Sequence, residues 1–152
     1  MLQTTPSTFT KKRNLYSSLL VTTGCNERIP TPKVLVVEDN FLIQYTTQKT
    51  LENLGCRVDI ANTGKQALIL AKQNYYNLIF MDIELPDLSG LEITREIRQG
   101  KYWSKGSPIV VITSHTENEI KKECMLSGTN EVLTKPVYSQ KFEDLLKAYV
   151  VF

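Results

Sequence analysis

Three short apolar runs constrain the fold of this chain most strongly. They occupy residues 34–37, 78–81 and 109–112, and each is a continuous stretch of apolar side chains rather than an alternation of apolar and polar ones. Such a run is typical of a strand that is buried on both faces, as in a parallel sheet covered by helices. Two weaker segments of the same length, 57–60 and 131–134, complete a set of five expected strands.

Helix signals fill the intervals between these strands. Ser89 with Glu92, and Thr116 with Glu119, have the spacing of a capping box, in which two side chains cap the start of a helix. The other expected helices begin at Asp39 or Asn40, after Thr63, and near Ser139. Five strands that alternate with five helices predict an α/β fold with a doubly wound parallel sheet. The flavodoxin-like strand order 2-1-3-4-5 is the common choice at this size.

Residues 1–32 differ in composition from the rest of the 152-residue chain. They are rich in Thr, Ser and Pro, and we expect a flexible segment or linker before one domain at 33–152. Lys11-Lys12-Arg13 followed by Leu15–Val21 faintly resembles a secretory signal, but the apolar part is short and interrupted. The sequence contains no run of 18 apolar residues, so we predict no transmembrane helix. We therefore expect a cytoplasmic protein.

Charge and cysteine content exclude several classes of function. Residues 33–152 carry 14 basic and 15 acidic side chains, so we expect no nucleic-acid partner. The three cysteines, Cys25, Cys56 and Cys124, are odd in number and widely spaced. They predict neither a disulfide framework nor a zinc site, which agrees with a reducing compartment.

Polar side chains stand at the carboxyl ends of four predicted strands: Glu38 and Asp39, Asp82, Thr113, and Lys135. Taken alone, Asp82 is equally compatible with a turn or a helix cap. In the order 2-1-3-4-5, however, the three carboxylates share one crevice. Charges 4 Å apart repel by about 4 kcal/mol at an effective dielectric constant near 20. Such a cluster must bind a cation or hold a proton, and oxygen ligands favour Mg²⁺, or Mn²⁺, over zinc. The threonine and the lysine complete a site for phosphoryl oxygens, with Asp82 as the nucleophile.

Four segments at these positions resemble the signatures of response-regulator receiver domains of two-component phosphorelays. They are Val36-Val37-Glu38-Asp39-Asn40, Met81-Asp82 through Gly90, Ile112-Thr113-Ser114 and Leu133-Thr134-Lys135-Pro136. The similarity extends over roughly residues 33 to 150. It is closest to the receivers of hybrid sensor histidine kinases, notably the anaerobic redox-responsive type.

The resemblance implies a role for each site residue. Asp82 would accept the phosphoryl group from a phosphohistidine. Asp39 and Asp82 would bind Mg²⁺ directly, Glu38 through water, and Glu84 through its backbone carbonyl. Thr113 would hydrogen-bond the phosphoryl group. Lys135 would pair with a phosphoryl oxygen, and a cis peptide bond to Pro136 is expected.

The resemblance also implies partners and output. The donor would be a histidine kinase or a histidine phosphotransfer protein, and the domain itself would make no membrane contact. We expect it to catalyse its own phosphorylation and dephosphorylation, without turnover of a separate substrate. Because the chain stops after the last helix, we expect output by protein contact or relay through the face of the fourth helix, fifth strand and fifth helix.

Departures from the family pattern leave two alternatives. Val132 stands where many receivers have an aromatic residue that responds to activation, while Glu84 and His115 occupy positions that tune dephosphorylation in the family. A pseudo-receiver that only binds partners would lack a response dependent on Asp82. A haloacid-dehalogenase-like phosphatase also uses an Asp nucleophile, but it requires Asp-x-Asp where this chain has Glu38-Asp39.

Overall fold

A computed structural model describes residues 30–150 and shows the expected sheet. Its strands are β1 (Lys33–Val37), β2 (Arg57–Ala61), β3 (Leu78–Asp82), β4 (Ile109–Thr113) and β5 (Glu131–Thr134). All four pairings are parallel, and the order is β2-β1-β3-β4-β5. The predicted fold class and strand order are confirmed. The prediction for residues 1–32 falls almost entirely outside the described residues.

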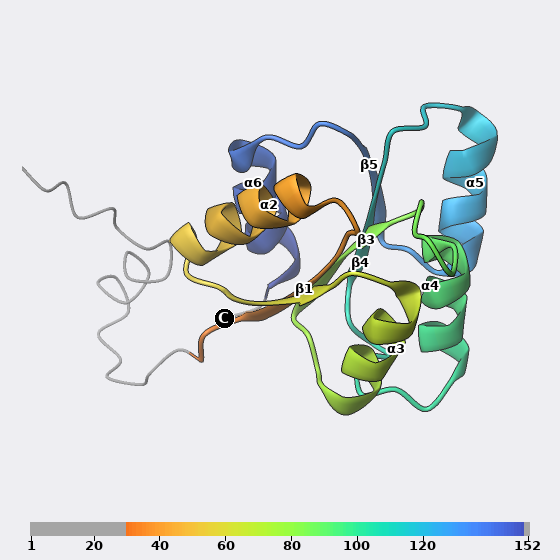
Figure 1. Ribbon diagram of the computed structural model, residues 1–152, viewed down its shortest axis with the longest axis horizontal. Coiled ribbons are helices and arrows are strands. Elements are labelled where there is room, and N and C mark those ends of the chain that lie inside the picture. Colours follow the sequence, from red (N-terminus) through yellow and green to blue (C-terminus); the bar gives the residue numbers. More distant parts are fainter. Residues whose placement is uncertain (1–29, 151–152) are drawn as a thin grey trace, which may run out of the picture.

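Five helices cover the two faces of the sheet (Figure 1). They are α2 (Phe41–Asn53), α3 (Gly64–Gln73), α4 (Gly90–Gln99), α5 (Asn118–Ser127) and α6 (Ser139–Tyr149). Helices α2 and α6 lie on one face, and α3, α4 and α5 lie on the other. Within residues 30–150, none of these helices combines the length and apolar character needed to cross a bilayer.

The continuous apolar strands contribute side chains to two hydrophobic cores, one on each face of the sheet. In β3, Ile79 and Met81 pack toward α3 and α4, whereas Leu78 and Phe80 pack toward α2 and α6. All four side chains are essentially inaccessible to solvent. The ring of Phe80 meets Phe142 of α6 edge to face, with centroids 5.1 Å apart. Successive side chains of a strand point to opposite faces, so a strand between two helical layers must be apolar at every position.

The helix starts agree with the sequence with one exception. Asn40 caps α2, Thr63 caps α3, and Ser89 with Glu92 forms the expected capping box at α4. The prediction of a second capping box, at Thr116 and Glu119, is wrong. Helix α5 begins one residue later, and its N-cap is Glu117, which makes no capping hydrogen bond. The Glu117 carboxylate instead lies 3.7 Å from Nδ1 of His115.

Candidate functional site

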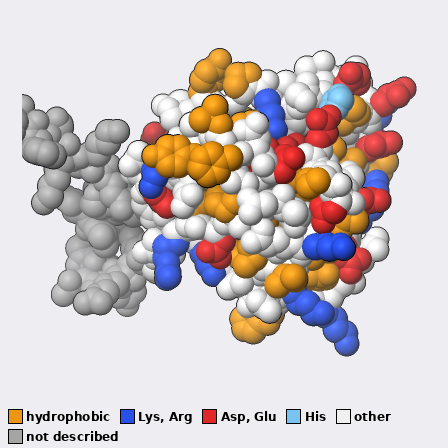
Figure 2. All heavy atoms as spheres, viewed as in Figure 1, with side chains coloured by type: hydrophobic (Ala, Val, Ile, Leu, Met, Phe, Trp, Pro, Cys, Tyr) orange, Lys and Arg blue, Asp and Glu red, His pale blue; other side chains and the backbone are white. Residues whose placement is uncertain are grey.

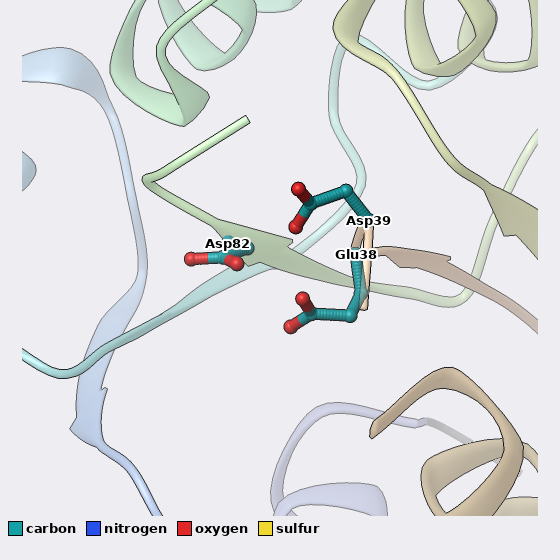
Figure 3. A group of neighbouring side chains, drawn as sticks. All are labelled: Glu38, Asp39 and Asp82. Carbon is teal, nitrogen blue, oxygen red and sulfur yellow. The ribbon is translucent and has the colours of Figure 1, made fainter. Parts of the chain in front are cut away.

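Three carboxylates meet where β1 and β3 end. Glu38 and Asp39 follow β1 directly, and Asp82 is the last residue of β3. The two strands are neighbours, with Val37 paired to Met81, so their carboxyl ends open into the same crevice. One oxygen from each carboxylate lies within 4.8 Å of the other two (Figure 3). Glu38 and Asp82 are buried, while Asp39 is exposed.

Lys135 joins this cluster from the end of β5. Its Nζ lies 3.0 Å from Oε2 of Glu38 and 3.1 Å from Oδ2 of Asp82. Burial alone would lower the pKa of Lys135, but the hydrogen bonds and charges of these two carboxylates outweigh burial and raise it. The lysine therefore stays protonated. One positive charge among three negative charges leaves the cluster with a net negative charge.

Backbone and amide groups hold the two buried carboxylates in place. The N–H of Asn40 donates to Oε1 of Glu38 at 3.1 Å, and the N–H of Glu84 donates to Oδ1 of Asp82 at 3.1 Å. Burial raises the pKa of Glu38, although the hydrogen bond from Lys135 opposes that shift. The fold thus brings Glu38 into a place that disfavours its negative charge.

Gln44 is a supporting residue that the sequence analysis did not identify. Its side-chain amide, in the second turn of α2, donates to the backbone carbonyl of Glu38 and to the side chain of Asn62. Gln44 is nearly buried, and it stands on the inward face of a helix that otherwise presents Thr47 and Leu51 to the core. A polar residue at an inward helical position was the available signal.

The end of β4 supplies Thr113 beside the cluster. This residue is buried, and its hydroxyl accepts a hydrogen bond from the backbone N–H of His115 at 3.0 Å. Strand β4 pairs with β3, with Ile112 opposite Asp82, so Thr113 follows immediately at the same edge. The side chain of Glu84 pairs with Nε2 of His115. The Glu84 carboxylate is thus not one of the three that converge. Its backbone carbonyl is the group that the resemblance implies as a Mg²⁺ ligand.

The donor set fits a hard divalent cation. The cleft is lined by the following residues: Glu38, Asp39, Asn40, Ile43, Asp82, Glu84, Leu85, Pro86 and Lys135. It contains no cysteine or histidine, so its ligands are oxygens of the kind that Mg²⁺ and Mn²⁺ prefer. The peptide bond between Lys135 and Pro136 is cis, as the resemblance implied.

Comparison with known proteins identifies the family of this chain. The family model for the response regulator receiver domain matches residues 34–148. The chain belongs to this family. Over 121 residues it is 36% identical to the aerobic respiration control sensor protein ArcB of Escherichia coli, covering 80% of this chain and 15% of that protein. It is 35% identical over 114 residues to the autoinducer 2 sensor kinase/phosphatase LuxQ of Vibrio vulnificus, covering 75% of this chain and 13% of that protein.

Solved receiver structures are also similar. The receiver domain of the sensor histidine kinase PA1611 from Pseudomonas aeruginosa superposes with a TM-score of 0.73 at 31% identity, covering 80% of this chain and 98% of that one. That domain was crystallised with a magnesium ion coordinated in its active-site cleft. The chemotaxis protein CheY4 of Vibrio cholerae gives a TM-score of 0.74 at 28% identity, covering 79% and 99%. The protein is therefore a receiver domain of two-component signalling, similar to those of hybrid histidine kinases, although it spans only a small part of the sensor kinases it matches.

Proposed function

We propose that this receiver accepts a phosphoryl group on Asp82 from a phosphohistidine, in a reaction that requires Mg²⁺. The observation that carries the proposal is the convergence of Glu38, Asp39 and Asp82 within 4.8 Å of one another, with Lys135 bonded to two of them. Crowded carboxylates cost free energy unless a cation offsets their repulsion. A structural role alone does not account for such a cluster.

The reaction makes one bond and breaks another. A carboxylate oxygen of Asp82 attacks phosphorus, a P–O bond forms, and the P–N bond of the donor phosphohistidine breaks, its electron pair leaving with the imidazole nitrogen. Asp39 and Asp82 would hold Mg²⁺ directly, Glu38 through water, and Glu84 through its carbonyl. The bound ion, for which Mn²⁺ could substitute, supplies positive charge that offsets the charge of the phosphoryl group.

Lys135 and Thr113 would hold the transferred group. The Lys135 ammonium, already 3.1 Å from Asp82, would contact a phosphoryl oxygen once that carboxylate is esterified. The hydroxyl of Thr113 accepts from His115 N–H, and a hydroxyl can donate its own proton at the same time. Thr113 can therefore donate to a phosphoryl oxygen without giving up its present hydrogen bond.

The proposed donor is a histidine kinase or a histidine phosphotransfer protein in the cytoplasm. Neither a nucleic acid nor a membrane is proposed as a partner of the domain itself, and output would pass through protein contact or relay.

Incubation with Mg²⁺ and either acetyl phosphate or a phosphorylated histidine donor tests the proposal. Intact-mass analysis should show one added phosphoryl group on the wild type and none on Asp82→Asn or after chelation of Mg²⁺. Asp87→Asn is the matched control, because Asp87 lies nearby on the same loop but binds the start of α3, and it should be labelled normally. A wild type that gains no phosphoryl group from any donor would be a pseudo-receiver. Sustained hydrolysis of small phosphoesters would instead indicate a phosphatase.

A further inference from the structure

A cavity of about 210 Å³ lies between α2 and α6, beside the phosphoacceptor site. Much of its wall is formed by side chains of the core that these two helices cover: Val36, Phe80, Ile112, Val137 and Phe142. An engineered cavity of about 150 Å³ with an apolar lining is large enough to bind benzene. This cavity can therefore hold a molecule of one or two rings.

The cavity is distinct from the cleft in which Glu38, Asp39 and Asp82 converge. Asp39 and Glu84 line only the cleft, whereas Thr47 and Phe142 line only the cavity. Four residues line both spaces: Glu38, Ile43, Asp82 and Lys135. A molecule in the cavity would therefore reach the reacting carboxylate from the side of α2 and α6, and it would leave Asp39 and Glu84 accessible from the cleft.

The cavity also contains a buried hydroxyl group without a partner. Of the three threonines in α2, Thr46 donates to the carbonyl of Leu42 at 3.0 Å and Thr50 donates to the carbonyl of Thr46 at 2.9 Å, as helical threonines usually do. The third, Thr47, is only 8% exposed, and its hydroxyl makes no hydrogen bond with any group in residues 30–150. Ser107 has the one fully enclosed, unbonded side-chain oxygen in that range, so the Thr47 oxygen is open to the cavity that Thr47 lines.

These surroundings favour an aromatic ligand over water. A buried water typically makes about three hydrogen bonds. The cavity offers few partners for them, because Glu38 and Asp82 are already bonded to Lys135. Phe80 and Phe142, which meet edge to face, provide a wall against which another aromatic ring can pack. A ring with one polar group would satisfy the Thr47 hydroxyl as well, which removes the cost of an unpaired buried group.

The cavity is reached through an apolar part of the surface. Thr46 and Pro136 line it and are exposed, so it opens to solvent between α2 and the segment that precedes α6. Leu42 and Tyr138, the sequence neighbours of two other lining residues, are 69% and 74% exposed. Figure 2 shows hydrophobic side chains gathered over α2 and the start of α6. An apolar molecule therefore meets apolar side chains before it enters the cavity.

We propose that this cavity binds a small aromatic molecule of one or two fused rings that carries a single hydrogen-bonding group, such as a phenol or an indole. The ring packs against Phe80 and Phe142, and its polar group bonds to the hydroxyl of Thr47. The phosphoryl transfer proposed above uses neither Thr47 nor the apolar wall of the cavity. Binding is therefore independent of phosphorylation at Asp82.

Titration of the full chain with indole, followed in ¹⁵N–¹H spectra, tests the proposal. We expect saturable shifts with a dissociation constant on the order of 1 mM or below. The largest shifts should occur at Thr46, Thr47 and Phe142. Shifts that do not saturate, or that centre on Leu85 in the cleft or on the exposed Trp103, would overturn the proposal.

The variant Thr47→Val tests the polar contact, because it removes the hydroxyl and keeps the shape of the side chain. Its affinity for indole should fall about fivefold, the value of one ordinary hydrogen bond, while its affinity for benzene should not change. Equal affinities of variant and wild type for indole would overturn the assigned contact. The urea midpoint of the variant should be no lower than that of the wild type. A lower midpoint would show that ordered water already satisfies the hydroxyl, which would also overturn the proposal.

A pair of matched variants tests the location of the site. Thr46→Phe places a ring at the entrance of the cavity and should abolish indole binding. Thr50→Phe makes the same change one turn further along α2, at a residue that does not line the cavity, and should preserve binding. Both variants lose the same kind of hydrogen bond to a helical carbonyl, so they differ mainly in their position relative to the cavity. Indole binding that survives Thr46→Phe would place the ligand elsewhere and overturn the proposal.

Discussion

Asp82 and Asp87 lie on one short stretch of chain at the same edge of the sheet, but in opposite environments. The Asp87 carboxylate accepts hydrogen bonds from the backbone N–H groups of Lys65, at 2.9 Å, and Gly64, at 2.7 Å, at the start of α3. These bonds lower the pKa of Asp87. Asp82 is instead buried against Glu38, whose pKa is raised by burial.

The Asp87 carboxylate therefore stabilises the fold, whereas the crowded carboxylates of Glu38 and Asp82 do not. The ionised Asp87 carboxylate accepts hydrogen bonds from free backbone N–H groups at the start of α3, so its charge stabilises the folded state. Glu38 and Asp82 gain their partner in Lys135 but remain crowded. Substitutions in the turn between β3 and α4 should therefore reduce stability, while substitutions in the cluster should reduce function.

The largest expected effect on stability is at Gly90. A Cβ atom there would lie 2.1 Å from the backbone carbonyl oxygen of Asp82, so Gly90→Ala must displace the end of β3 or the start of α4. We expect a loss of about 3 kcal/mol in the free energy of unfolding, measured by urea denaturation. Gly106→Ala is the control, because a Cβ there would meet no atom within 4 Å. Similar midpoints for the two variants would show that this turn is not under steric constraint.

The capping box at α4 should contribute less. Ser89 N–H donates to Oε2 of Glu92 at 2.9 Å, and Ser89 Oγ accepts from the N–H of Leu91 at 3.2 Å. Ser89→Ala should lower the unfolding free energy by about 1 kcal/mol. Thr116→Ala, at the capping box that does not form, should change it by no more than about 0.5 kcal/mol. An equal loss at Thr116 would contradict the helix start described above.

A smaller effect, dependent on pH, is expected at Asp87. Because its pKa is lower in the folded state, ionised Asp87 adds stability above its ordinary pKa, and this contribution is lost as the pH falls through the folded value. Asp87→Asn should thus be less stable than the wild type at neutral pH, and the two should converge in strong acid. Denaturation curves over a pH series provide the measurement. A gap that does not change with pH would refute the assigned role of the charge.

Glu38 should show the opposite sign, with the smallest effect. Because its pKa is higher in the folded state, its contribution is complete below its ordinary pKa and is lost as the pH rises through the folded value. Glu38→Gln keeps an acceptor for Asn40 N–H and Lys135, so at neutral pH the variant should be at least as stable as the wild type. A clear loss of stability at neutral pH would place Glu38 in the same class as Asp87.

Much of this structure could be predicted from residue patterns. Strands that are apolar at every position are stable only between two helical layers, and this determined the fold class. The strand order was predicted as the common one for an α/β domain of this size. Given that order, Glu38, Asp39 and Asp82 had to meet, because β1 and β3 are neighbours. Local capping was predictable wherever side-chain geometry agreed with the backbone, as at Ser89.

Contacts between distant loops could not be predicted. The N-cap of α5 is Glu117 rather than Thr116, and it follows a loop in which His115 pairs with Glu84 from another loop. The bonds of Asp87 to the start of α3 and of Gln44 to the side chain of Asn62 likewise join segments whose proximity arises only in the folded chain. Sequence spacing contains no direct signal for such pairs.

The central claim is that the crowded carboxylates of Glu38, Asp39 and Asp82 bind a divalent cation that offsets their repulsion. The dependence of stability on Mg²⁺ tests this claim most directly. Urea denaturation of wild type and Asp82→Asn, with and without Mg²⁺, gives the four free energies required. Without Mg²⁺, the variant should be no less stable than the wild type. With Mg²⁺ at 100 times its dissociation constant, the wild type should gain about 2.7 kcal/mol and the variant far less. An equal gain in both proteins, or none in the wild type, would contradict the account.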